Sequence, residues 1–211
     1  YNVNILDTPW QLYFAEVSFR TLTAFVTVII LVVGAKCVEA QTRNLMEVCR
    51  MRQTPVIFFV NKMDREGRGP FDLLDELEEE LKISVRPLSW PIEQGVRFKG
   101  VYNIYEEKLD LYQPSKQVVT EKIEIDLEGN ELEKQVGKSE AEKLRSDLEL
   151  INGVYSEFQV EEYLKGELAP VFFGSALNNF GVKELLDCCV GIAPSPRPIE
   201  AEQRLSLITT C

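Results

Sequence analysis

Runs of apolar residues separated by polar segments predict alternating strands and helices along the first part of the chain. Val26–Val33 and Val56–Val60 are uncharged and rich in β-branched residues, which is typical of parallel strands covered on both faces. Apolar positions at helical spacing predict helices over residues 38–52 and 71–81, the second with an acidic outer face. A shorter alternating strand is expected over residues 2–6. This order indicates an α/β domain with a mainly parallel sheet and flanking helices.

The pattern changes after residue 82. Residues 83–113 hold prolines, glycines and scattered aromatic residues, and predict short antiparallel strands. Residues 121–168 carry 14 acidic and 6 basic side chains, and predict helices over 139–151 and 157–165. Residues 171–173 resume the buried-strand pattern, and a last helix is expected over 182–192.

An inserted α+β subdomain therefore interrupts the predicted α/β domain. The chain between Asn61 and Gly174 is far longer than one crossover helix requires. We expect four parts. They are the second half of the α/β domain (1–82), the inserted subdomain (83–168), the return to the α/β domain (169–193), and a linker with a tail (194–211).

Composition excludes several functions. The 211 residues carry a net charge of −11, which disfavours direct binding to nucleic acid. No histidine is present, so imidazole catalysis and histidine-ligated metals are excluded. The most apolar run, Ala24–Val33, is about half the roughly 20 residues of a membrane span, so no membrane association is expected. Five cysteines without a CxxC pair, and no secretory leader ahead of them, favour a reducing, cytoplasmic setting.

Asn61-Lys62-Met63-Asp64 follows a predicted parallel strand, where ligands bind in open α/β sheets. A carboxylate at Asp64 can accept hydrogen bonds from the N1–H and N2–H2 groups of guanine, which adenine lacks. Asn61 can donate and accept beside it, and the stem of Lys62 can lie along the base. Alone, such a string is as well explained by a helix N-cap.

Two further strings occur at predicted strand ends. Gly174-Ser175-Ala176-Leu177 can present backbone N–H groups to the guanine O6 atom, and its alternative is an ordinary strand-to-helix turn. Asp7-Thr8-Pro9 follows the first strand, where Asp7 can hold Mg²⁺ through water. As a lone tripeptide it would be a plain turn. Three such strings in this order are difficult to assign to chance.

These strings resemble the third, fourth and fifth guanine-nucleotide boxes of translational GTPases. Further segments closely resemble bacterial peptide chain release factor 3: residues 19–24, 38–42, 61–67, 90–92, 98–102 and 170–181. The resemblance implies a P-loop-NTPase-like GTPase domain that binds GTP or GDP with Mg²⁺. It also implies GTP hydrolysis in translation termination, with the ribosome and class I release factors as partners.

The 211 residues contain no GxxxxGK[ST] phosphate loop. Gly137-Lys138-Ser139 has Leu132 where the first glycine must be, and we interpret it as coincidence. The resemblance implies that the phosphate loop would precede Tyr1, so that the chain is an N-terminally truncated fragment. It also places Gln11 at the water-orienting position and Trp10 at a glycine that approaches phosphate. Negligible hydrolysis is therefore expected.

A second hypothesis is a degenerate GTPase-like domain that binds a protein partner without nucleotide. Apolar and aromatic residues over 10–17 motivate it, because clustered exposed aromatics often mark interfaces. The same side chains can instead fill space left by missing strands. Burial of this segment would favour the second interpretation. The acidic charges of residues 121–168 can likewise face a basic partner or solvent.

Overall fold

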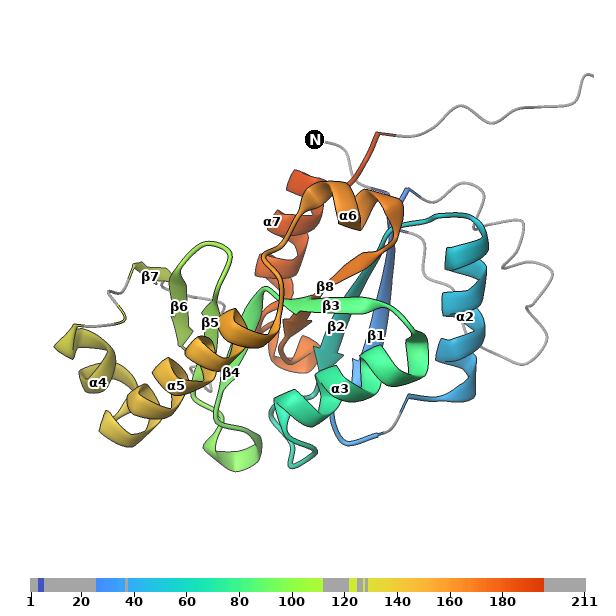
Figure 1. Cartoon of the computed structure of the whole chain (residues 1–211). Helices are drawn as coiled ribbons and strands as arrows, with labels where there is room; N and C mark the ends of the chain where they lie inside the picture. The colour runs from blue at the N-terminus through green and yellow to red at the C-terminus, as the bar shows by residue number, and fades with distance from the viewer. Residues whose placement is uncertain are drawn as a thin grey trace, which may run out of the picture.

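Four parallel strands form a central sheet in the computed structural model, which describes residues 4–5, 26–36, 38–111, 122–124, 127 and 129–195 (Figure 1). The strands lie in the order β1-β2-β8-β3, and each neighbouring pair is parallel. In that order, the strands are β1 (Val28–Val33), β2 (Val56–Asn61), β8 (Leu168–Phe173) and β3 (Ser84–Pro87). The predicted α/β class is confirmed.

Helices cover both faces of this sheet (Figure 1). On one face, α2 (Ala40–Met51) and α3 (Pro70–Leu81) pack against alternate side chains of β2, including Phe58. On the other face, α6 (Val160–Lys165) and α7 (Val182–Ile192) pack against the remaining alternate side chains, including Phe59. The predicted helices over 38–52, 71–81 and 182–192 therefore exist, and they bury β2 and β8 almost completely.

Strand β1 departs from the expectation of burial on both faces. Ile30 and Val32 are buried toward α2, but Leu31, on the opposite face, is 62% exposed. The cluster that contains α6 and α7 reaches Ile29 without Leu31. Strand β1 therefore has one covered face and one partly open face among the described residues.

The inserted region forms a separate antiparallel sheet beside the parallel one (Figure 1). Its strands pair in chain order. They are β4 (Ser89–Ile92), β5 (Gly100–Asn103), β6 (Lys108–Leu111) and β7 (Lys122–Glu124). Helices α4 (Asn130–Val136) and α5 (Lys138–Val154) follow. The helix predicted over 139–151 is α5, and the helix predicted over 157–165 is the shorter α6. The sequence pattern did not predict α4.

Strand β3 corrects the prediction of antiparallel strands from residue 83. It pairs parallel with β8, from Ser84 opposite Leu168 to Pro87 opposite Val171. The chain then leaves the parallel sheet directly: the Leu88 amide donates to the Val171 carbonyl at 2.9 Å, and β4 begins at Ser89. Strand β3 has only four residues, two of them polar. So short a segment has no hydrophobic periodicity that could show which sheet it joins.

The strand expected over residues 2–6 is wrong for its two described residues. Asn4 and Ile5 are not in a strand, and Ile5 is 73% exposed. The rest of that strand, the segment 10–17 and most of the predicted tail lie outside the described residues. In the described part of the chain, no helix combines the length and apolarity needed to cross a bilayer. The division into four parts stays a prediction.

Candidate functional site

The segments 61–64 and 174–177 lie side by side at the carboxyl ends of two neighbouring strands. Strand β2 ends at Asn61 and β8 ends at Phe173, and the two strands pair up to Val60 opposite Phe173. Beyond the strands, the Gly174 amide donates to the Val60 carbonyl at 3.0 Å, and the Met63 amide donates to the Gly174 carbonyl at 3.1 Å. The sheet therefore brings together two strings that are far apart in the sequence.

The side chain of Asn61 joins the two loops. Its Oδ1 atom accepts the Lys62 amide at 2.8 Å and the Ala176 amide at 2.9 Å. Both bonds use Oδ1, so neither of them occupies the side-chain N–H groups on Nδ2. Asn61 thus holds both loops together, in addition to the direct base contact expected from the sequence.

Lys62 turns the chain away from β2. Its φ of 68° lies in the left-handed region, and its carbonyl accepts the Arg65 amide at 3.0 Å. The side chain is exposed, as a residue that lies along a bound base must be in the free protein.

Asp64, expected from the sequence to accept hydrogen bonds from guanine, has a buried acceptor atom. Its Oδ1 atom is buried and accepts no hydrogen bond from any described residue. Shielding a carboxylate oxygen without a donor is unfavourable, because the lost hydration is not replaced. A ligand with N–H groups would supply the hydrogen bonds that water no longer makes to this oxygen.

Ser175 is fully buried and organises the second loop through its backbone. Its amide and carbonyl both bond to Phe180, each at 2.9 Å, and its Oγ accepts the Asn178 side-chain amide at 3.0 Å. Leu177 is 79% exposed beside them. Sequence reasoning did not assign Phe180 a role, since its part in the loop arises from this backbone pairing.

The amides of Gly174, Ser175 and Ala176 are thus engaged by Val60, Phe180 and Asn61. This differs from the expected arrangement, in which such groups point toward the guanine O6 atom. Gly174 itself is required by close packing, because a Cβ there would lie 2.2 Å from the Phe180 carbonyl oxygen. The loop therefore acts at least as a support for Asn61.

The residues expected to handle phosphate and metal, Asp7 and Gln11, lie outside the described residues. No group of three or more potential metal ligands occurs in the part of the chain that the structure describes. In the string Gly137-Lys138-Ser139, Gly137 separates α4 from α5 and the other two residues begin α5, so the string does not follow a strand. That location supports our interpretation of this string as coincidence.

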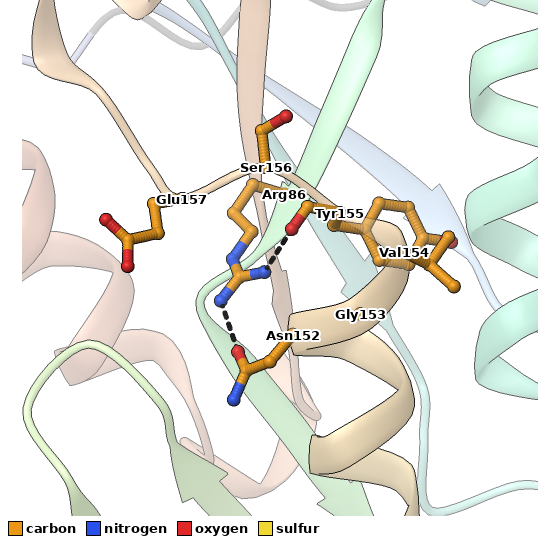
Figure 2. Close-up of a pocket in the computed structure, with 7 residues that line it drawn as sticks. All are labelled: Arg86, Asn152, Gly153, Val154, Tyr155, Ser156 and Glu157. Atoms are coloured by element: carbon orange, nitrogen blue, oxygen red, sulfur yellow. Dashed lines mark hydrogen bonds between the residues drawn. The ribbon is translucent and has the colours of Figure 1, made fainter.

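A cavity of about 570 Å³ lies at the end of α5, lined by Arg86 and residues 152–157 (Figure 2). The buried Arg86 guanidinium donates to the carbonyls of Ile151 and Tyr155 at 3.2 and 3.0 Å, and to Asn152 Oδ1 at 2.8 Å. Burial lowers the pKa of Arg86, and Glu157 opposes that shift. Arg86 therefore caps the end of α5, a role that the sequence pattern did not indicate.

A parallel sheet with helices on both faces and two polar loops at adjoining strand ends is an arrangement in which α/β domains bind ligands. The family comparison identifies it as a GTP-binding domain of the translational GTPase type. The chain belongs to the elongation factor Tu GTP binding domain family, whose model matches residues 1–195.

A crystal structure of a protein from Thermus thermophilus is similar, with a TM-score of 0.60 and 20% sequence identity. The match covers 84% of this chain and 28% of that chain, so this chain spans well under half the length of that protein. At this identity the likeness concerns the fold alone.

Proposed function

We propose that the chain recognises the guanine base of GDP and GTP through Asp64, with Asn61, Lys62 and the 174–177 loop around it. The observation that carries this proposal is the buried Asp64 Oδ1 atom, which has no donor among the described residues. Asp64 belongs to the 61–64 segment, which the Asn61 side chain joins to Ala176. The family match supports a guanine nucleotide as the ligand.

Specificity follows from donor and acceptor positions. Guanine offers N1–H and N2–H2 to the two carboxylate oxygens of Asp64. Adenine offers an unprotonated N1 and a C2–H at that edge, so both oxygens would remain without donors. Leaving a buried charged acceptor unpaired costs about 1–3 kcal/mol or more. The chain should therefore reject ADP.

We further propose that the 211-residue chain alone does not hydrolyse GTP. Its sequence contains no GxxxxGK[ST] string, and phosphate positioning with charge stabilisation supplies most of the catalysis in this reaction class. Gln11 as the water-orienting residue and Asp7 as an indirect Mg²⁺ ligand remain proposals based on the resemblance.

The cellular role that we propose is that of release factor 3 in translation termination. The segments that resemble that family, including Trp90-Pro91-Ile92 and the run from Phe98 to Tyr102, support it. Under this proposal the protein acts in the cytoplasm on the ribosome, where GTP hydrolysis by the whole protein promotes recycling of class I release factors.

One observation favours a second candidate, a partner-binding module without nucleotide. The amides of Gly174, Ser175 and Ala176 are satisfied within the protein. A loop with three of its four amides already engaged has fewer donors to offer a base. Nucleotide binding by the purified chain separates the two candidates.

The test is calorimetric titration of the chain with GDP and ADP. Saturable binding of GDP alone is expected, and Asp64→Asn should weaken it by about 10- to 100-fold. Asp75→Asn, an exposed change on α3, should leave GDP binding unchanged. The amide introduced by Asp64→Asn can donate to a carbonyl at C2, so xanthosine diphosphate should bind this variant better than GDP does. Equal binding of GDP and ADP would contradict the proposal.

A further inference from the structure

The connection between β4 and β5, residues 93–99, belongs to the inserted region but contacts the 61–64 loop. The Gly95 amide donates to the Met63 carbonyl at 2.9 Å. Gly95 has a φ of 66°, and a Cβ there would lie 2.3 Å from Glu66 Oε1. We name residues 93–99 the 93–99 loop. Its backbone thus supports the middle of the segment that places Asp64.

The same loop also reaches the 174–177 segment indirectly, through the ring of Phe180. Phe98 packs edge to face on Phe180, with ring centroids 5.4 Å apart, and both residues are 5% exposed. Phe180 is the residue whose backbone pairs with Ser175 in both directions. One loop of the insertion therefore supports both loops of the candidate guanine site.

Strand β4 strengthens this support where it leads into the loop. The buried Ser89 Oγ accepts the Phe173 amide at 2.9 Å. The Trp90 ring packs between Phe71 of α3 and Phe173, with centroid separations of 4.6 and 5.5 Å. Phe173 directly precedes Gly174, so the end of β8 is fixed by the insertion as well as by β2.

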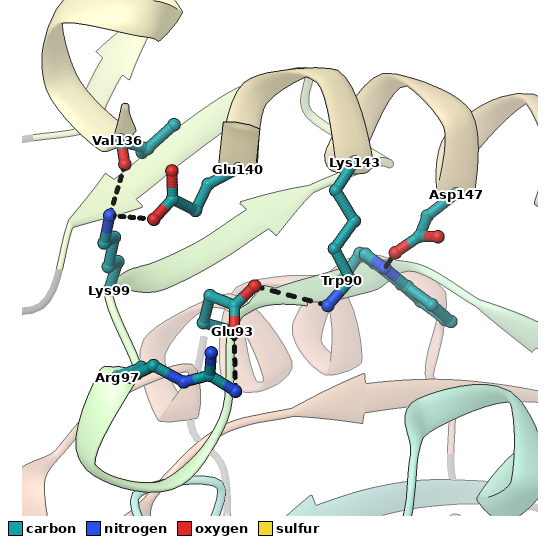
Figure 3. Close-up of polar contacts among 8 residues, drawn as sticks. All are labelled: Trp90, Glu93, Arg97, Lys99, Val136, Glu140, Lys143 and Asp147. Atoms are coloured by element: carbon teal, nitrogen blue, oxygen red, sulfur yellow. Dashed lines mark hydrogen bonds and ion pairs between the residues drawn. The ribbon is translucent and has the colours of Figure 1, made fainter. Parts of the chain in front are cut away.

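The other side of the 93–99 loop is attached to α4 and α5 (Figure 3). Lys143 pairs with Glu93 at 3.3 Å, and Lys99 pairs with Glu140 and donates to the Val136 carbonyl. On β4, just before the loop, Trp90 Nε1 donates to Asp147 Oδ2 of α5 at 3.0 Å. A displacement of α5 would therefore act on the 93–99 loop through several contacts.

We propose that the 93–99 loop, with Phe98 as its principal side chain, positions both guanine-recognition loops, so that the inserted region sets the affinity for nucleotide. This inference rests on the proposed function. Its physical basis is preorganisation: a loop already held in its binding conformation loses less entropy when the ligand binds. Phe98 is a positioning residue, since its described ring contact is with Phe180 and no contact with a base is assigned to it.

The first test replaces the Phe98 ring and measures GDP affinity of the 211-residue chain. Phe98→Ala should raise the Kd for GDP by at least about tenfold, and Phe98→Leu should raise it less, because part of the packing remains. The control Leu45→Ala removes a buried side chain on α2, away from the insertion. It should lower stability without changing the Kd. An unchanged Kd in a folded Phe98→Ala chain would overturn the proposal.

A second readout needs no nucleotide. Backbone hydrogen exchange should accelerate at Met63, Ser175 and Phe180 in both Phe98 variants, whereas β1 and β2 keep their protection. If the unaltered chain binds no GDP, the proposed base recognition fails, and the exchange data alone decide on the positioning role. Faster exchange confined to the two loops supports that role. Unchanged exchange in these loops, or equal acceleration throughout the chain, contradicts it.

Discussion

The parallel sheet is stabilised almost entirely by apolar burial, whereas the inserted region combines apolar packing with many polar contacts. Strands β2 and β8 are uncharged, and their four phenylalanines are at most 1% exposed. The inserted region shares an apolar core with the parallel sheet, and several polar contacts in addition hold its strands and loops to its helices. These polar contacts include the Arg86 cap on α5, the Trp90 bond to Asp147, and the Lys99 pair with Glu140. Apolar packing thus builds the parallel sheet and seats the insertion on it through Trp90 and Phe98, whereas polar contacts mainly fix β4 and the 93–99 loop to α4 and α5.

The largest effect should come from the centre of the parallel sheet. Phe173→Ala removes a fully buried ring that touches Trp90, and should lower the free energy of unfolding by about 3–5 kcal/mol. Chemical denaturation measures this change. Leu177→Ala, four residues further along and 79% exposed, should change it by less than about 0.5 kcal/mol. Similar values for the two variants would contradict the assignment of the core.

Arg86→Met should have the next largest effect. The change keeps an apolar stem but leaves the Ile151 and Tyr155 carbonyls without their donor, and should cost about 2–4 kcal/mol. The same denaturation experiment applies. Recovery of full stability with methionine would show that the guanidinium is not needed to end α5.

Trp90→Phe should have a smaller effect, because an aromatic ring stays between Phe71 and Phe173. The bond from Nε1 to Asp147 is lost, which should cost about 1–2 kcal/mol. Asp147→Asn keeps an acceptor oxygen and should cost less. If Trp90→Phe were neutral, the attachment of β4 to α5 would rest on the remaining contacts alone.

The smallest effect concerns pH. The hydrogen bond from Lys99 lowers the pKa of Glu140 from its ordinary value of 4.5. A lowered folded-state pKa contributes stability above pH 4.5, and this stability is lost as the pH falls through the lowered value. Glu140→Gln should therefore flatten the acid limb of the stability curve slightly. Thermal unfolding between pH 3 and pH 7, compared with that of the exposed variant Glu142→Gln, measures it.

Much of the parallel sheet was predictable, because long apolar runs such as Val56–Val60 have few alternatives to a buried strand. The two loops were predictable because each follows such a run directly. The fold class is confirmed, and the loops do meet at neighbouring strand ends. Their roles toward a nucleotide stay predictions.

Other features depend on contacts between distant segments. Strand β3 is four residues long, and only its pairing with β8 shows which sheet it joins. Phe98 and Phe180 are ordinary aromatic residues in the sequence, and their ring contact arises from the placement of the insertion. Likewise, the sequence does not show that Ala176 donates to Asn61 instead of remaining free for a base.

The most direct test of the central claim compares GDP with inosine diphosphate on the unaltered chain. Inosine lacks the N2 amino group, so one of the two proposed hydrogen bonds to Asp64 disappears while the rest of the ligand is unchanged. The Kd for inosine diphosphate should be about tenfold higher, since one hydrogen bond to a charged group is worth about 1.5 kcal/mol. Equal affinity for the two nucleotides would contradict recognition of guanine by Asp64.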